Sequence, residues 1–260
     1  KKFLNLRIII IIIIIIIMKK TIILISAMAF LFTSCDKDKP KETDITINFT
    51  HTVDGAGLIT NSMIYTNDAG ENYDIQTLKY LISDITLHAE NGSSLLLNEV
   101  HFIDISDLST FSFTYNDVPN NNYTSISFDM GLDADKNIPN KYVNKDFHAT
   151  MFWPVSMGGG YHYMKLEGDF NDSLSGYGTH TGGTMGNDYS FNNTNNITLT
   201  VDDNLANASI NINMEINSWY QKPNQIDFAS YGMGIMMNMM MQMNIKMNGV
   251  SDVFSVTVDK

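Results

Sequence analysis

The six histidines are the side chains of this sequence best suited to bind a transition metal, because neutral imidazole is the commonest metal ligand in proteins. They lie at His51, His88, His101, His148, His162 and His180. No two are four residues apart, the spacing that would place two imidazoles on one face of a helix. A metal site would therefore be assembled from strands that are distant in sequence. For His88 and His101 we favour a hydrogen-bonded or solvated side chain over a ligand.

Methionine is concentrated near the end of the chain, where eight of the 17 fall within residues 233–247. Because methionine forms helices well and no β-branched run opposes it, we predict a short helix over 233–247. One stripe shares helical spacing and is predicted to pack as a core face: Met233, Met236, Met237, Met240, Met241 and Met247. The alternative is a thioether-rich surface for Cu(I), since soft sulfur ligands select that ion. Packing is favoured because a core needs apolar residues in any case, although it leaves Met239 and Met243 unexplained.

The stretch 151–168, MFWPVSMGGGYHYMKLEG, gathers a tryptophan, a histidine and three methionines around three glycines. Pro154 and the glycines at 158–160 are expected to reverse the chain, so that residues 161–167 form the next strand. The glycines precede a strand, whereas a phosphate-binding loop must open a helix. The stretch therefore predicts a turn that carries Trp153 and His162, with no nucleotide site.

Strand signals recur through the rest of the chain, where residues alternate between apolar and polar with the period of a half-buried strand. The clearest runs are 45–52, 123–129, 197–201 and 208–216. Residues 75–88 fit either a helix or a strand, but the β-branched Ile82, Ile85 and Thr86 favour a long or bent strand. The pattern predicts an all-β protein, an antiparallel β-sandwich with a short Met-rich helix near its C-terminus.

The first residues resemble an export signal. The run Ile8–Ile17 has no periodicity that packing could select, so we expect upstream sequence translated from a misplaced start, with Met18 as the initiator. From there two lysines, an apolar run and LFTSC before the only cysteine resemble a bacterial lipoprotein signal. A transmembrane helix is disfavoured because the lysines interrupt the apolar run. We predict that residues 1–34 are a leader and signal peptide, that Cys35 is lipidated, and that residues 35–44 form a tether to a domain at 45–258.

Removal of residues 1–34 would leave 11 Lys and Arg against 28 Asp and Glu, a formal charge of −17. Such an acidic surface opposes binding to nucleic acid or anionic lipid and attracts cations. With the lipid on Cys35 as its membrane contact, the protein is expected in the cell envelope, at the outer membrane or cell surface.

The sequence lacks the parts of a nucleophilic enzyme, since its cysteine is assigned to the lipid and it has no G-x-S-x-G elbow. We therefore expect binding and not turnover. Asp133, Asp135 and Asn137 match the first half of a calcium-binding EF-hand loop. Ile138 stands where glycine is required, and Asn144 where the bidentate glutamate should be. We favour a polar loop over a calcium site.

Several motifs taken together resemble the MbnP-like family of copper-binding proteins. They are FTHTVDG at 49–55, LKYLISDITL at 78–87, M-x-W and G-Y-x-x-x-K-L-E-G within 151–168, THTG at 179–182 and NGVSDVF at 248–254. The resemblance implies a β-rich, exported protein that binds copper, as Cu(I) or Cu(II), for acquisition or handling. It also implies a copper-uptake system or a di-haem peroxidase as a partner.

The same resemblance implies that copper is held by imidazoles and by a tryptophan oxidised to kynurenine. Trp153 stands in M-x-W, His180 in the H-x-G motif, and His51 in F-x-H is the natural second imidazole. His162 and His148 remain open as the second ligand instead. The candidate metal-site residues are His51, His180, Trp153, His162 and Met151.

Two other functions remain open. One is a non-metal binding module that captures a glycan or peptide on aromatic residues such as Tyr161, Tyr163 and Trp219. The other is a redox protein in which a tryptophan-derived group passes electrons to a haem partner. An intact mass separates the two, because only the second requires a modified tryptophan.

Overall fold

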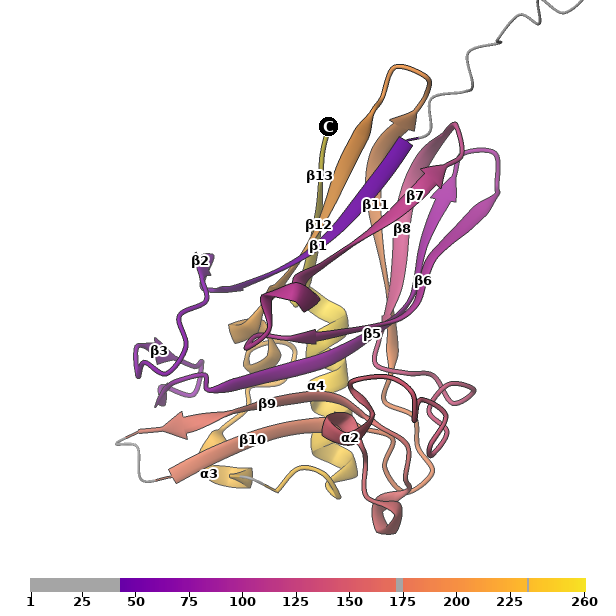
Figure 1. Ribbon diagram of the computed structural model, residues 1–260. Helices are drawn as coiled ribbons and strands as arrows, with labels where there is room; N and C mark the ends of the chain where they lie inside the picture. The colour runs from indigo at the N-terminus through magenta and orange to yellow at the C-terminus, as the bar shows by residue number, and fades with distance from the viewer. Residues whose placement is uncertain (1–42, 172–174, 233) are drawn as a thin grey trace, which may run out of the picture. The chain divides into compact units, whose positions relative to one another are not determined.

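The computed structural model describes residues 43–171, 175–232 and 234–260 (Figure 1). The predicted leader, the lipidation site Cys35 and the tether up to residue 42 lie outside the described residues, as does Met233. The first described strand begins at Thr43, two residues before the predicted start of the domain at residue 45. Among the described helices, none is long and apolar enough to cross a membrane.

Two sheets form the all-β sandwich that the alternating sequence pattern predicts. The smaller sheet has five strands in the order β13-β12-β1-β2, with β7 also paired to β1. Its strands are β1 (Thr43–Val53), β2 (Ala56–Gly57), β7 (Ser112–Val118), β12 (Asn207–Glu215) and β13 (Phe254–Asp259). β1 and β12 run parallel, unlike the other described pairs, which are antiparallel. Parallel pairing is available here because the whole larger sheet connects the two strands.

The larger sheet has eight strands in the order β11-β8-β5-β9-β4-β3, with β10 paired to β9 and β6 paired to β5. Its strands are β3 (Tyr65–Thr66), β4 (Asn72–Tyr73), β5 (Thr77–Ala89), β6 (Ser94–Asp104), β8 (Asn121–Met130), β9 (His162–Phe170), β10 (Ser175–Gly182) and β11 (Phe191–Val201). β5 is a central strand of this sheet, because its first part pairs with β9 and its second part with β8. Within the part that pairs with β8, Asp84 takes a φ of 53°, and the register shifts there. The ambiguous segment 75–88 is therefore a bent strand, as its β-branched residues favour.

Each face of the larger sheet covers a separate group of buried apolar side chains. Tyr80 and Ile82 of β5 point into the main core, which lies between the two sheets. Leu81, which alternates with them, points to the opposite face and packs with Tyr163 and Met151. This second cluster is covered by the segment that connects β8 to β9.

Short helices join the strands. They are η2 (Leu108–Phe111), α2 (His148–Met151), η3 (Val155–Met157), η4 (Ile216–Tyr220), α3 (Phe228–Tyr231) and α4 (Met239–Asp252). Figure 1 shows α4 beside the β9–β10 hairpin, and the helix contacts η4, β11 and β10. The predicted Met-rich helix is thus confirmed, but with different bounds. It starts late because the Asn238 side chain accepts a hydrogen bond from the Met241 amide and caps the helix there.

The predicted methionine core face is wrong. Met237 is 58% exposed, Met240 69% and Met247 45%. The side of α4 that packs on the domain instead carries Gln242, Ile245, Asn248 and Gly249. The buried amides are satisfied by hydrogen bonds. Asn248 Nδ2 donates to the carbonyl of Trp219 at 2.8 Å, and Gln242 Nε2 donates to that of His180 at 2.7 Å.

Gly249 is the point at which α4 approaches the core most closely, because a Cβ there would overlap the rings of Phe191 and Trp219. Alanine normally favours a helix over glycine by about 1 kcal/mol. We expect Gly249→Ala to lower the free energy of unfolding by about 1–3 kcal/mol all the same, because of overpacking. Urea denaturation measures this change. Ser251→Ala, at an exposed position of the same helix, should change stability by less than about 0.5 kcal/mol. A stabilised Gly249→Ala protein would contradict this packing.

Candidate metal centre

A closed hairpin carries Trp153 to the edge of the larger sheet. The Trp153 amide donates to the carbonyl of Gly160 at 2.9 Å, and Phe152 and Tyr161 form a β-bridge. The three glycines between them all have positive φ, with 122° at Gly158, 75° at Gly159 and 89° at Gly160, a region that favours glycine. The chain reversal predicted from the sequence is confirmed, and β9 begins at His162 directly after it.

Trp153 is fully buried against the backbone of β10. Its six-membered ring lies where a Cβ on Gly182 would be, so glycine is required for this approach. Its indole Nε1 donates to the carbonyl of Met157 at 3.3 Å. The ring centroid lies 4.7 Å from that of His162, with the planes at 67°. Trp153 therefore forms one wall beside the His162 imidazole.

His162 is buried, with its Nδ1 3.2 Å from the carbonyl oxygen of Met151. Because a carbonyl can only accept, Nδ1 carries the proton and Nε2 keeps its lone pair. Burial, together with the charge of the neighbouring His180, lowers the pKa of His162 to about 3. The ring is neutral at physiological pH, which is the form that binds metals.

His180, on β10, is oriented by a carboxylate. Its Nε2 lies 2.6 Å from Glu167 Oε1, and this hydrogen bond lowers the pKa of Glu167 to about 2. Glu167 is thus an acceptor, so Nε2 donates. The Nδ1 atom of His180 is buried and has no hydrogen-bond partner among the described residues. A buried polar atom without a partner is costly, and a ligand would satisfy it.

A β-bulge brings the two imidazoles together. His180 pairs with Lys165, and in a regular ladder His162, three residues away, would point to the opposite face. The register shifts between Thr181 and Gly182, so that Gly182 pairs with His162. Bulges re-aim side chains in this way. The His162 and His180 ring centroids lie 5.2 Å apart, with the planes at 80°.

His51 is held elsewhere. Its Nε2 hydrogen bonds to the Tyr80 hydroxyl at 3.0 Å, and its ring packs edge-on against Phe111 within the core between the sheets. His180 alternates with Thr179, whose hydroxyl hydrogen bonds within that core, so His180 faces away from it. The structure therefore groups His180 with His162 and not with His51.

The remaining histidines make hydrogen bonds of their own. His88 contacts the hydroxyls of two serines, Ser94 and Ser127, and His101 Nε2 donates to the carbonyl of Thr110 at 2.8 Å. Their interpretation as hydrogen-bonded side chains is confirmed. His148 Nδ1 lies 2.9 Å from the hydroxyl of Tyr161. Met151 contributes its carbonyl to His162, while its side chain packs in the second cluster.

The comparisons with known proteins agree with this architecture. A sequence model of the family described as MbnP matches residues 42–241. The chain belongs to the MbnP family. The solved structure of MbnP from Methylosinus trichosporium superimposes with a TM-score of 0.56 and 11% sequence identity, over 84% of this chain and 99% of that one. At this identity the likeness shows a shared fold. A search of curated proteins finds no match to the sequence.

In this MbnP-family chain the EF-hand-like residues are engaged by other groups. Lys136 Nζ lies 2.6 Å from a carboxylate oxygen of Asp84 and 2.7 Å from one of Asp133, next to Asp129. Asn137 donates to the Tyr163 hydroxyl. The ammonium group thus supplies positive charge between two of these acids, and the calcium site considered from the sequence stays a prediction.

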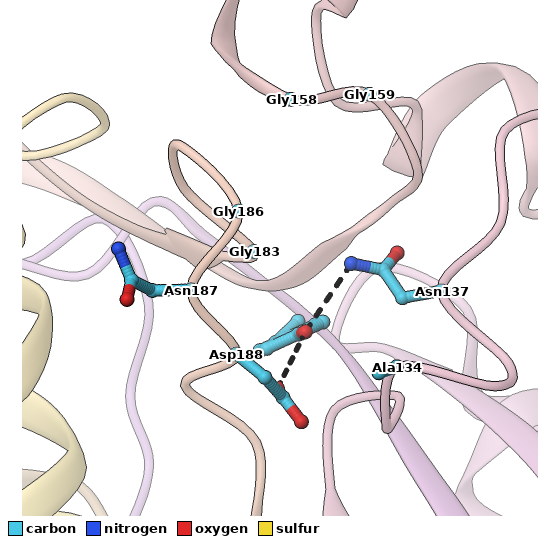
Figure 2. Close-up of a pocket in the computed structure, with 9 residues that line it drawn as sticks. Ala134, Asn137, Gly158, Gly159, Gly183, Gly186, Asn187 and Asp188 are labelled. Carbon is cyan, nitrogen blue, oxygen red and sulfur yellow. Dashed lines mark hydrogen bonds between the residues drawn. The ribbon is translucent and has the colours of Figure 1, made fainter.

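A cavity of about 160 Å³ lies beside the hairpin (Figure 2). It is lined by backbone of Gly158, Gly159, Gly183 and Gly186 and by Ala134, Asn137, Tyr163, Asn187 and Asp188. The Tyr163 hydroxyl donates to Asp188 Oδ1 at 2.9 Å and accepts from Asn137 Nδ2 at 3.2 Å, which are the dashed bonds of Figure 2. No histidine is among its lining residues, so the cavity is separate from the His162–His180 pair.

The aromatic residues considered for glycan or peptide capture are buried. Tyr161 and Trp219 are at most 1% exposed, and Tyr163 is 2% exposed. They therefore offer no stacking surface to such a ligand. Glu167 was not predicted from the sequence, although it lies within the G-Y-x-x-x-K-L-E-G motif. The register of β9 against β10 places it near His180, and the sequence alone does not give that register.

Burial lowers the pKa of His51 to about 4, against 6.5 in an exposed chain. Between these values the unfolded chain binds a proton that the folded protein does not, so stability falls as the pH is lowered from 6.5 towards 4. We expect His51→Gln to remove about 2.5 kcal/mol of the difference in unfolding free energy between pH 7.5 and pH 4.5. Urea denaturation at both pH values tests this. Tyr80→Phe removes the hydrogen bond but should keep the pH dependence, and an unchanged slope in His51→Gln would disprove the assignment.

Proposed function

We propose that this MbnP-family chain binds copper between the imidazoles of His162 and His180. The observation that carries the proposal is the hydrogen bonding of the two rings and their closeness. Each has one nitrogen hydrogen bonded to an oxygen acceptor, His180 Nδ1 is buried without a hydrogen-bond partner among the described residues, and the ring centroids are 5.2 Å apart. In metal sites, an oxygen that accepts a hydrogen bond from the ring nitrogen not bound to the metal orients the histidine and raises its basicity. The role is binding and not turnover.

The surroundings of the pair suit a copper ion. Neutral imidazole binds copper in both oxidation states. The Glu167 carboxylate lies behind His180 and adds negative charge, and Trp153 excludes water beside His162. The acidic balance of the chain, with 28 Asp and Glu against 16 Lys and Arg, favours the approach of a cation.

Trp153 enters the proposal in two forms. Indole is only a hydrogen-bond donor, so the unmodified side chain is an apolar wall. With dioxygen as the oxidant, cleavage of the indole C2–C3 bond and hydrolytic loss of C2 as formate would leave kynurenine, whose aromatic amine would add a nitrogen ligand beside His162. We propose that the complete copper centre consists of the two imidazoles and this modified side chain. The intact mass of the protein and of the peptide that contains Trp153 tests it.

The proposed setting is the cell envelope. A lipid at Cys35 would anchor the chain at the outer membrane or cell surface, where it would acquire or handle copper with an uptake system or a di-haem peroxidase. Metabolic labelling with a fatty-acid analogue, compared between the natural chain and Cys35→Ala, tests the anchor. In the redox alternative, a modified Trp153 passes electrons to the haem partner.

Copper titration against competing chelators tests the binding site. We expect His162→Ala and His180→Ala each to weaken binding of Cu(I) or Cu(II) by more than about 100-fold, because each removes a ligand. Glu167→Gln should weaken it by about 10-fold to 100-fold, since it removes only the acceptor that orients His180.

His51→Gln and His148→Ala are the matched controls, since neither residue contacts the pair, and both should bind copper as the natural chain does. Circular dichroism and urea denaturation verify folding for every variant. Affinity weaker than micromolar in the natural protein, or unchanged affinity in His162→Ala and His180→Ala, would exclude copper binding at this centre. A loss of affinity confined to His51→Gln would move the site to the core between the sheets.

A further inference from the structure

A row of methionines on α4 points away from the domain. Met239 is 49% exposed, Met240 69%, and Met243 and Met247 are 45% each. At 100° per residue these four side chains lie within an arc of about 100°. The buried Ile245 lies on the opposite side of the helix. Met241, which falls on the packed side by the same spacing, is half-buried against the main core.

Packing does not account for this row. An exposed helix face normally carries charged or polar side chains. Here the outward face carries uncharged thioethers, followed by the exposed Val250, with the half-buried Lys246 at its side. The property that the four exposed methionines share beyond apolar character is sulfur. A thioether is a soft ligand that needs no deprotonation, and it selects monovalent copper over harder ions.

A neighbouring turn adds to the same surface. The Thr184 hydroxyl donates to the carbonyl of Met236 at 2.9 Å, and Asn187 Nδ2 lies 3.4 Å from the sulfur of Met239. Met185, between these two turn residues, is 59% exposed. The contact with Asn187 shows that the Met239 sulfur presents a lone pair at the start of α4. The turn thereby brings Met185 towards the N-terminal end of the methionine row.

The helix is fixed to the strand that carries His180. Gln242 is fully buried, and its Nε2 donates to the carbonyl of His180 at 2.7 Å. Its Oε1 accepts from the amide of Gly182 at 3.3 Å. The methionine row is therefore on a helix that is fixed to β10, the strand that carries His180.

We propose that the row Met239, Met240, Met243 and Met247 is a second metal site that binds Cu(I) through thioether sulfur, with each ion held by residues three or four positions apart. Side chains four residues apart on a helix have Cβ atoms about 5–6 Å apart. The unbranched methionine side chain has enough freedom to bring neighbouring sulfurs onto one ion. This site uses none of the imidazoles and does not depend on copper binding by them.

The test uses Ag(I), a redox-stable ion with the ligand preferences of Cu(I), titrated into the purified protein. The variant Met239→Leu/Met243→Leu/Met247→Leu removes three sulfurs and keeps the size, the helix propensity and the apolar surface. We expect it to bind one Ag(I) fewer, or to bind it at least tenfold more weakly. Met241→Leu is the matched control on the packed side of the same helix. The sulfur scattering in copper X-ray absorption should fall in the triple variant alone.

The double variant His162→Ala/His180→Ala separates this proposal from the imidazole centre. It should retain the sulfur-bound Ag(I), and retention would hold even if the imidazole centre binds no copper. Equal Ag(I) binding by the natural chain and the triple leucine variant would overturn the proposal. Self-association through this surface in both proteins, with no Ag(I) bound by the methionines of the natural chain, would also overturn it, because apolar character and not sulfur would then be the function of the surface.

Discussion

The β-bulge between β9 and β10 is the constraint on which the candidate metal centre depends. A regular ladder would separate His162 and His180 on the two faces of the sheet. One shifted residue places their rings side by side and brings Gly182 to the position that admits the Trp153 ring. The hairpin, the tryptophan wall and the imidazole pair thus follow from one local irregularity. The sheet on either side of it supplies the rigidity that a binding site needs.

Gln242 links this irregularity to the last helix. A buried amide has both donor and acceptor groups to satisfy, and Gln242 satisfies them on the backbone of His180 and Gly182, on both sides of the bulge. The same bonds decide which side of α4 faces inward. Once the polar side chains of Gln242 and Asn248 are buried in the core, Met239, Met240, Met243 and Met247 lie on the outer face. The way in which α4 packs on the domain therefore accounts both for its buried amide side chains and for its exposed methionines.

The alternating runs at 45–52 and 123–129 revealed strands because burial in the structure follows the same two-residue period. The hairpin at 151–168 could also be predicted from the sequence, since proline and glycine determine backbone conformation locally. The position of His180 beside His162 could not be predicted from the sequence. It depends on strand register and on a bulge, and neither leaves a mark in composition. The methionine face failed for a related reason: helical spacing identifies a stripe, but the choice of the buried stripe is made by the contacts of Gln242 and Asn248.

The parallel pairing of β1 with β12 has a consequence for the life of the chain before it folds. Asn48 hydrogen bonds to Asn211, 163 residues further along the sequence. The first strand therefore lacks its main partner until nearly the whole polypeptide has been made, and such long-range pairing slows folding. The smaller sheet of a nascent chain can therefore close only after β12 has been synthesised.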